Sequence, residues 1–457
     1  MPYIPHSKAD TESMLESIGV EKIEQLFDEI PQSLLYGELK NIPEGLSEMA
    51  MLKEAQKLAH KNQSGICFLG AGSYEHHIPA AVWDIASRGE FLTAYTPYQA
   101  EASQGTLQLL YEFQTMIAEL TGLDVANASM YDGASALAEA VLMAVRLNKK
   151  SKSNRVLVTG TLHPLYRETL ETIVRTQHIE VTTLPFDLEA GISSMTELAK
   201  FNNDDITALV IPQPNFFGCL ELVDELSNWA YAHGAISIAC VNPTSLAVLN
   251  PPGEWGEHGV DIACGEGQPL GAPIASGGPY FGFLSTRLQY VRQMPGRLIG
   301  QTVDKEGKSG FSLTLQAREQ HIRRGKATSN ICTNQGLLVT AATIYMSLLG
   351  AEGLFEVARQ CHLNTQKLKT MLLAIKGVEA VFTAPSFHEM VLKLSQPADE
   401  VLLKLRQYGI IGGYALESHF PQLKNCILIC ATEMRTPDEM QHYVDSLKQI
   451  LHVGEHE

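Results

Sequence analysis

Apolar and polar positions along the middle of the chain follow two alternating periods. Short runs that are apolar on both faces alternate with stretches of helical periodicity. The runs predict strands at 155–159, 179–184, 206–211 and 235–241, and the stretches predict helices at 163–177 and 220–233. Strands that are apolar on both faces are typical of a parallel sheet covered by helices on both sides. The pattern therefore predicts a large α/β domain.

The order of elements changes after about residue 330. The pattern predicts helices near 336–349, 354–373 and 399–408, and strands at 378–382, 390–394 and 426–431. For the last helix, Thr436 is a capping residue, Pro437 suits the first helical position and Glu439 completes a capping box. This order is typical of a small α+β domain.

The first 65 residues are polar, with apolar residues at roughly helical spacing. These apolar residues are Leu15, Ile18, Ile23, Leu26, Phe27 and Ile30, and a second run covers 46–58. Such a segment is either an arm that packs on another chain or an ordinary surface layer of helices. We predict three parts: a helical arm at 1–65, a large α/β domain at 66–330 and a small α+β domain at 331–457.

The composition argues against several classes of function. The net charge of −17 argues against broad nucleic-acid binding, because a polyanion would be repelled. We expect no secretory signal and no membrane span. The eight cysteines are scattered, with no Cys-x-x-Cys, which favours reduced thiols in a cytoplasmic protein.

Two motifs that could carry chemistry are incomplete. The run 66–72 opens like a dinucleotide-binding turn, but the third glycine is missing, and no phosphate-binding Gly-Lys-Ser/Thr occurs. His76 and His77 are adjacent, and neighbouring side chains rarely bind one metal. We expect hydrogen-bonded histidines and no metal site.

Residues 127–135 precede a strongly predicted helix at 136–147. Gly133 and Ser135 would let backbone amides approach an anion at the helix start, where partial positive charge accumulates. The alternative is a plain helix cap made by Asp132 or Ser135.

Two further segments have the composition of binding surfaces. The loop 91–105 contains Tyr95, Tyr98 and Glu101 and precedes a predicted helix at 106–120; it is either a binding surface or a packed interface. Residues 318–333 hold the densest basic stretch, with Arg324 and Lys326 near its centre. A bound phosphate or carboxylate would explain that concentration, and so would a salt-bridged domain junction.

Taken together, several long segments resemble the glycine decarboxylase (P-protein) family of the glycine cleavage system, and more narrowly the alpha chains of its two-subunit form. The segments that carry the resemblance are 70–82, 93–108, 127–140 and 318–335. Gly325 departs from the family pattern, which has an acidic residue there. The resemblance implies the pyridoxal-phosphate (PLP)-dependent transferase fold type I, aspartate-aminotransferase-like, with a mainly parallel large-domain sheet and a small α+β C-terminal domain.

A catalytic member of such a family needs a lysine that holds PLP as an imine. Residues 201–304 contain no lysine, although they include the late strands of the large domain. The segment 261–269 stands where catalytic relatives carry a His-Lys pair, and Asn242 follows the predicted strand at 235–241, where an aspartate is expected. The resemblance therefore implies a chain that cannot bind PLP covalently.

The resemblance also implies a partner and a reaction. A lysine-bearing beta chain, subunit 2, would hold the PLP, in an expected alpha2-beta2 heterotetramer. The complex would decarboxylate glycine and transfer the aminomethyl group to the lipoyl group of H-protein. The site residues that it implies are Tyr95, Tyr98, Glu101 and Thr328 toward the partner's active site, Thr328, Lys326 and Arg324 at the partner's PLP phosphate, and Gly133, Ser135 and His163 in a vestigial pocket.

Two alternatives stay open. The chain could be a self-sufficient PLP decarboxylase or transaminase that uses a different lysine. It could also be a non-catalytic subunit that only docks the lipoyl carrier or stabilises its partner.

Overall fold

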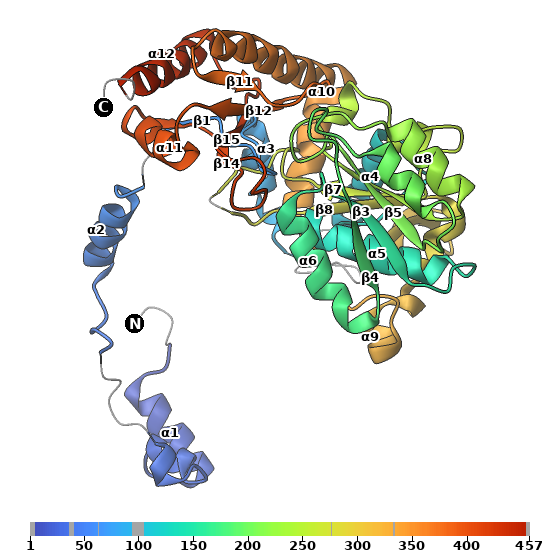
Figure 1. Cartoon of the computed structure of the whole chain (residues 1–457). Coiled ribbons are helices and arrows are strands. Elements are labelled where there is room, and N and C mark those ends of the chain that lie inside the picture. Colours follow the sequence, from blue (N-terminus) through green and yellow to red (C-terminus); the bar gives the residue numbers. More distant parts are fainter. Residues whose placement is uncertain are drawn as a thin grey trace. The chain divides into compact units, whose positions relative to one another are not determined.

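The computed structural model describes residues 5–35, 41–62, 64–93, 105–275, 277–331 and 334–453 (Figure 1). The chain divides into two compact units, Met1–Gln63 and Ser64–Glu457. Each unit is described by itself below.

The first unit consists of short helical segments. These are α1 (Lys8–Ile18), η1 (Ile23–Phe27), η2 (Gln32–Leu34) and α2 (Glu48–Ala59). A capping box between Ser7 and Asp10 starts α1, and Gly19 ends it in the left-handed conformation, with a φ of 84°. None of the residues in these helices is buried. The predicted helices are therefore present, but their apolar side chains are not covered within this unit.

The second unit is built on a seven-stranded sheet in the order β2-β8-β7-β6-β5-β3-β4. The strands are β2 (Val125–Ala126), β3 (Arg155–Thr159), β4 (Glu180–Leu184), β5 (Ala208–Gln213), β6 (Ile236–Val241), β7 (Ile262–Glu266) and β8 (Gly282–Thr286). Strands β3 to β7 are mutually parallel, and β8 runs antiparallel to β7 and β2. The four strands predicted in this region are confirmed as β3 to β6.

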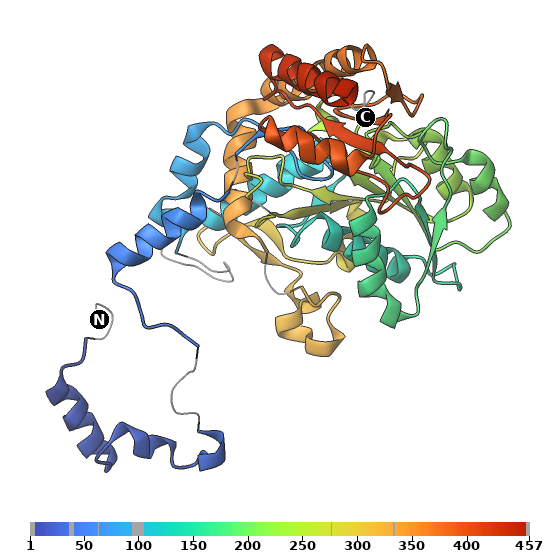
Figure 2. The same ribbon diagram turned by 60° about the vertical axis from the view of Figure 1, so that its left-hand side comes forward.

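Helices cover both faces of this sheet (Figures 1 and 2). They are α3 (Ala80–Ala86), α4 (Gly105–Thr121), α5 (Gly133–Leu147), α6 (Pro164–Val174), α7 (Met195–Leu198) and α8 (Val223–Ala232). Side chains alternate across the strands: Leu209 and Ile211 pack into the core that includes α4 and α8, whereas Val210 packs into the core that includes α5 and α6. This two-sided burial explains why β5 is apolar throughout.

A second, smaller layer forms from the C-terminal residues. Its antiparallel sheet has the order β11-β12-β15-β14, with β11 (Val378–Ala380), β12 (Glu389–Leu394), β14 (Tyr414–Ala415) and β15 (Cys426–Cys430). Helices α11 (Ala398–Gln407) and α12 (Pro437–Val453) belong to the same layer. The predicted capping box of α12 is confirmed, because Glu439 N–H donates to the Thr436 hydroxyl and Thr436 N–H donates to the Glu439 carboxylate.

A short segment from the N-terminal side joins this layer. Strand β1 (Ile66–Cys67) pairs in parallel with β13 (Ile410–Ile411), and Phe68 packs edge-on against Tyr443 at 4.8 Å between ring centroids. Residues just after 65 are therefore part of the layer that otherwise comes from the C-terminal end. The division at residues 65 and 330 stays a prediction.

Helix α10 (Gly336–Leu373) connects the two layers. It is long and apolar enough to cross a membrane by length and composition. However, Gly350 interrupts it with a φ of 60° and a ψ of −171°, which divides it close to the boundary predicted between two helices. Val339 before the break is buried in the large core, and Leu368 after the break is buried in the small one. We therefore interpret α10 as a core helix.

A hairpin that the sequence pattern did not predict lies before the basic segment. It consists of β9 (Leu298–Val303) and β10 (Ser309–Thr314), followed by α9 (Gln320–Arg323). The Asp304 carboxylate closes its turn by accepting the N–H groups of Glu306 and Lys308, both at 2.8 Å. The distal half of β9 is exposed, so no clear apolar period marks it.

Candidate functional site

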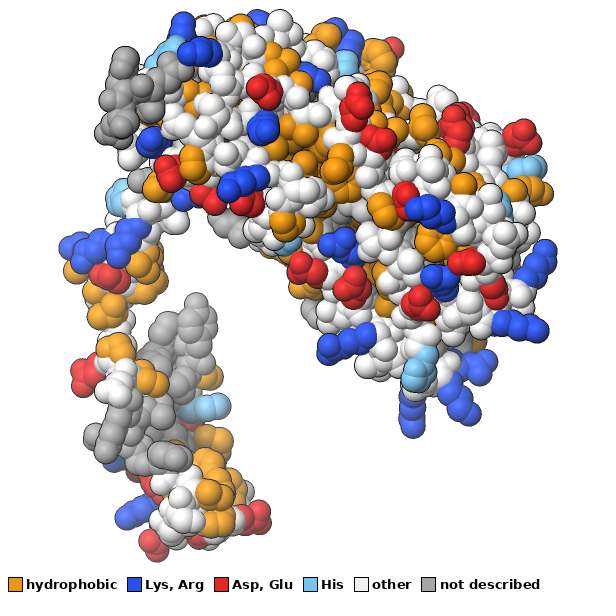
Figure 3. All heavy atoms as spheres, viewed as in Figure 1, with side chains coloured by type: hydrophobic (Ala, Val, Ile, Leu, Met, Phe, Trp, Pro, Cys, Tyr) orange, Lys and Arg blue, Asp and Glu red, His pale blue; other side chains and the backbone are white. Residues whose placement is uncertain are grey.

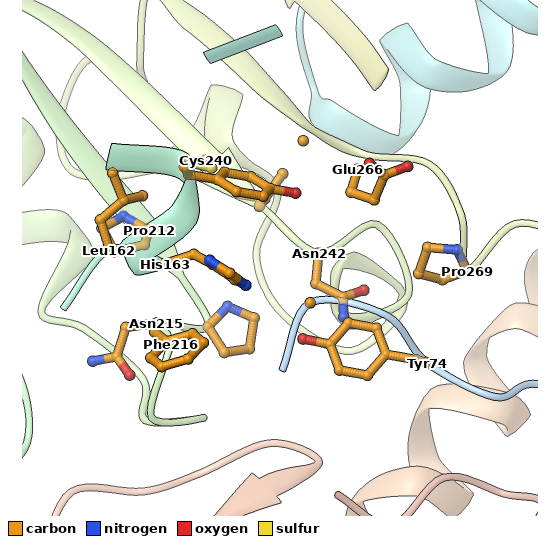
Figure 4. A pocket seen from close by; sticks show the side chains of 15 residues that line it. Tyr74, Leu162, His163, Pro212, Asn215, Phe216, Cys240, Asn242, Glu266 and Pro269 are labelled. Atoms are coloured by element: carbon orange, nitrogen blue, oxygen red, sulfur yellow. The ribbon is translucent and has the colours of Figure 1, made fainter. Parts of the chain in front are cut away.

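A small pocket lies beyond the carboxyl ends of the parallel strands β3, β5, β6 and β7 (Figure 4). Ligands of open α/β sheets bind at this edge. The pocket's volume is about 70 Å³, well below the roughly 300–1,000 Å³ of most pockets for cofactors and small molecules. Its side chains come mainly from Tyr74, His163, Phe216, Asn242 and Glu266.

His163 caps helix α6 directly after β3, and both of its ring nitrogens are used. Its Nε2 lies 3.0 Å from the carbonyl oxygen of Ala71, and its Nδ1 accepts the N–H of Leu165 at 3.2 Å. The ring stacks on Tyr166 and meets the edge of Phe216. Burial lowers the pKa of His163 to about 4, so the imidazole is neutral at neutral pH.

The predicted anion motif lies in the first turn of α5. Asp132 caps the helix by accepting the N–H of Ser135 at 2.7 Å, and the Ser135 hydroxyl accepts the N–H of Asp132 at 3.1 Å. The capping alternative is thus confirmed, and both the N–H and the hydroxyl of Ser135 are used in the cap. The N–H of Gly133 donates instead to the Oε2 atom of Glu266 at 2.9 Å.

Glu266, the last residue of β7, was not singled out from the sequence. Its second carboxylate oxygen accepts the N–H of Gln268 at 3.1 Å. Burial is the largest cause that raises the pKa of Glu266, to about 8, although both backbone donors lower it. A polar residue that ends an otherwise buried strand was the only signal of this role in the sequence.

A second carboxylate, Glu389, joins the two layers beside the pocket. It accepts the N–H of Ala71 at 2.7 Å and the hydroxyl of Tyr74 at 2.9 Å. Burial raises its pKa to about 7. Gln268 exchanges two hydrogen bonds with the backbone of Tyr74, both at 2.9 Å, so the loop after β1 is fixed from both sides.

Asn242 occupies the position after β6 where an aspartate was expected. Its amide nitrogen lies 3.1 Å from Nε2 of His388, and its amide oxygen accepts the N–H of Thr244 at 2.9 Å. No lysine or arginine is among the residues that line the pocket. Burial raises the pKa of Glu266, which lines the pocket, to about 8, and that of Glu389, which lies beside it, to about 7.

The basic segment around 318–328 does not line this pocket. Thr328 is half-buried and its N–H donates to the carbonyl oxygen of Arg318 at 2.9 Å. Arg324 and Lys326 are exposed, and neither forms an ion pair with another described residue. Where α9 lies in Figure 1, Figure 3 shows basic side chains gathered at the lower edge of the second unit.

Part of this segment is also tied to the domain. The Arg318 guanidinium donates to the carbonyl oxygen of Met294. Glu319 lies 3.9 Å from Arg297 and 3.6 Å from His321. The salt-bridged alternative therefore describes Glu319 and its neighbours, whereas Arg324 and Lys326 remain available at the surface.

The other expected partner-facing residues, Tyr95, Tyr98 and Glu101, lie outside the described residues. Of the remaining sites, His163 lines the pocket and Gly133 bonds to Glu266 in its wall, whereas Thr328, Lys326 and Arg324 do not line it.

One further polar cluster could hold a metal ion. His76 Nδ1 and Cys361 Sγ lie 2.8 Å and 3.2 Å from the same oxygen of Glu433. The other Glu433 oxygen accepts the N–H of His77 at 2.7 Å. These contacts form a hydrogen-bond network around one carboxylate, as expected for His76, and the free Nε2 of His76 lacks the second partner that metal-binding histidines usually have.

Known proteins resemble the chain along its whole length. A family model described as Glycine cleavage system P-protein matches residues 1–447. "Probable glycine dehydrogenase (decarboxylating) subunit 1" of Legionella pneumophila (strain Philadelphia 1) is 71% identical over 99% of both chains. The protein of the same name from Nitrosomonas europaea is 58% identical over 99% of both chains.

Solved structures agree with this similarity. The crystal structure of glycine decarboxylase (P-protein) of the glycine cleavage system, in inhibitor-bound form, has a TM-score of 0.90 and 42% identity, covering 99% of this chain and 100% of that one. A glutamate decarboxylase from Lactobacillus brevis has a TM-score of 0.68 at 11% identity, covering 94% and 97% of the two chains, which shows a shared fold only. The fold is therefore PLP-dependent transferase type I.

Proposed function

Because the chain belongs to the glycine cleavage system P-protein family, we propose that it is subunit 1 of a two-subunit glycine decarboxylase. In this proposal it acts only with a second subunit that holds PLP through its own lysine. The observation that carries the proposal is the pocket at the sheet edge, which lies where this fold binds ligands but has no lysine among its described lining residues.

The residues present do not fit PLP. An imine to the cofactor needs an amine, and residues 201–304 supply none. An acidic partner for the pyridine nitrogen is replaced by Asn242, whose amide is already bonded to His388 and Thr244. With Glu266 in place, the free volume of about 70 Å³ is small beside that of most cofactor pockets. No chemical step is therefore assigned to this chain's own pocket.

The proposed contribution of the chain lies at its surface. Within the described residues, the Thr328 hydroxyl has no hydrogen-bond partner, and Lys326 and Arg324 lie exposed within four residues of it. A hydroxyl donor with two nearby cations suits a phosphate presented by another chain. We assign Thr328, with Lys326 or Arg324, to the partner's cofactor phosphate, and Tyr95, Tyr98 and Glu101 to the rim of the partner's active site.

The proposed reaction belongs to the complex. It decarboxylates glycine on the partner's PLP and passes the aminomethyl group to the lipoyl group of H-protein. This chain would position groups and exclude water at the shared site. An alpha2-beta2 heterotetramer in the cytoplasm is the arrangement that we propose.

The first unit supports assembly with another chain. Its large apolar side chains are exposed, including Ile18 at 60%, Leu34 at 64% and Met49 at 67%. Exposed apolar surface of this extent marks an interface rather than a free helix. Deleting residues 1–62 should lower the number of subunits in the complex, measured by analytical ultracentrifugation, and an unchanged number of subunits would contradict this role.

Reconstitution tests the proposal. Glycine decarboxylation should require both subunits, and borohydride should attach the cofactor to the second subunit only, as read by intact-protein mass spectrometry. Turnover of glycine by the isolated chain, with a trapped cofactor on one of its lysines, would favour the self-sufficient alternative. A complex that works equally well with Thr328→Ala would favour a purely stabilising subunit.

A further inference from the structure

The start of helix α5 lies directly behind the pocket wall, because Gly133 contacts the lining residues Glu266 and Tyr166, and such a helix start would ordinarily attract an anion. Its first amides have no partner within the helix, and the helix dipole adds partial positive charge there. Asp132 satisfies the N–H of Ser135, which leaves the N–H of Gly133 for a further acceptor. Phosphate groups commonly bind at such positions.

In this chain an internal carboxylate fills that position. Glu266 reaches from the end of β7 so that Oε2 accepts the Gly133 N–H at 2.9 Å, while Oε1 accepts the Gln268 N–H at 3.1 Å. Gln268 is itself held by the carbonyl oxygens of Tyr74 and Ala272, at 2.9 Å and 2.8 Å. The carboxylate is therefore fixed in place on both sides.

Glu266 and Tyr166 pack tightly against Gly133. A Cβ atom at this position would lie 2.3 Å from the Tyr166 hydroxyl, 2.8 Å from the Glu266 nitrogen and 2.9 Å from the Glu266 Cβ. Glycine is therefore required by the close approach of β7 and α6. Figure 4 shows the Glu266 side chain directed along the wall of the pocket, opposite His163.

We propose that Glu266 is an internal substitute for a phosphate group and keeps phosphate-bearing cofactors out of this chain's own pocket. The loss of a lysine prevents a covalent bond to a cofactor; Glu266 additionally prevents non-covalent binding. In the complex, the cofactor would then load one type of subunit only. This inference rests on the proposed function, because it explains why one subunit of the pair is empty.

The test measures the binding of inorganic phosphate to the full-length chain by calorimetry. Glu266→Ala and Glu266→Ser remove the carboxylate and free the Gly133 amide. Either variant, if its thermal melt shows a folded protein, should bind phosphate about ten-fold or more tightly than the unaltered chain. The variants should also bind pyridoxal 5′-phosphate more tightly than pyridoxal, which lacks the phosphate. Glu389→Gln, which alters a buried carboxylate of the same region that is not bonded to α5, is the control and should bind like the unaltered chain.

A second measurement does not depend on opening the pocket. At about pH 9, above the pKa of about 8 that burial gives Glu266, Glu266→Gln keeps the shape of the side chain but removes its charge, so hydrogen exchange at the Gly133 amide should accelerate about ten-fold or more. Unchanged exchange there, or folded Ala and Ser variants that bind phosphate no better than the control, would overturn the inference. Cofactor trapped on the unaltered chain would instead overturn the proposed function, so the two failures are distinguishable.

Discussion

The pocket at the sheet edge and the basic segment at 318–328 differ in how their polar groups are satisfied. In the pocket, His163, Asn242 and Glu266 all bond to groups of the same chain, as does Glu389 beside it. In the basic segment, Arg324 and Lys326 are exposed without an ion pair among the described residues. The polar groups of the pocket are therefore satisfied within this chain, whereas the two cations of the segment are free to meet another molecule, as proposed above.

This difference separates two roles of polar residues that look alike in a single sequence. Polar residues in the pocket stabilise this chain, because unpaired buried groups would be costly. Polar residues in the basic segment contribute little to this chain's folding, since exposed charges are worth little by themselves. Substitutions in the pocket should therefore change stability, and substitutions in the segment should change the activity of the complex.

The largest effect is expected at Thr328. Thr328→Ala should lower glycine turnover by the reconstituted complex about ten- to a thousand-fold, as for the loss of one positioned donor in an active site. The melting temperature of the chain should stay nearly unchanged, because the hydroxyl has no partner among the described residues. Thr302→Ala, at an exposed threonine of β9, is the control. If the two variants were equally active, the basic segment would not be the part of this chain that serves the activity of the complex.

The next effect is a pH dependence that belongs to the pocket. Burial raises the pKa of Glu266 from 4.5 to about 8, so between these values the folded chain holds a proton that the unfolded chain releases. The free energy of unfolding contributed by this group is therefore highest below pH 4.5 and falls as the pH rises to about 8. The slope is at most about 1.4 kcal/mol per pH unit for one proton. Urea unfolding at several pH values should show a flatter curve for Glu266→Gln than for the unaltered chain, and parallel curves would contradict the shifted pKa.

A smaller effect on stability is expected at the start of α5. Asp132→Ala removes the acceptor of the Ser135 N–H and should lower the free energy of unfolding by about 0.5–2 kcal/mol. Glycine turnover by the complex should change little, measured with saturating partner. A loss of activity without a loss of stability would mean that this helix start still serves the reaction.

Much of the fold could be predicted because local pattern and burial agree. Strand β5 is apolar on both faces and α12 carries a complete capping box, so both were predicted close to their bounds. Strands β7 and β8 contain small and polar residues that are buried only because the neighbouring strands pair with them. Such strands have no apolar pattern of their own from which they could be predicted.

The pocket chemistry could be predicted only in part for a related reason. The absence of a lysine is visible in the sequence, and His163 stands beside the proline that starts a helix. Glu266 and Glu389 come from different layers. Glu389 bonds to Ala71 in the loop after β1, and Glu266 is linked to Tyr74 of the same loop through Gln268. Their positions depend on how the layers pack, which cannot be predicted from a short sequence motif.

The smallest effect is expected for the exposed cations of the basic segment. Lys326→Gln and Arg324→Gln should each weaken retention of PLP by the reconstituted complex by about 0.2–1 kcal/mol, because an exposed charge is well solvated and screened. The loss should be larger at low salt than at high salt, since the Debye length falls from about 30 Å at 0.01 M to about 10 Å at 0.1 M. Lys305→Gln, an exposed lysine in the turn between β9 and β10, is the matched control and should have no effect. Dialysis followed by absorbance of the retained cofactor measures all three variants. If Lys305→Gln weakened PLP retention as much, and salt had no influence, the segment would act only through general surface charge. The contrast with the closed pocket would then rest on Thr328 alone.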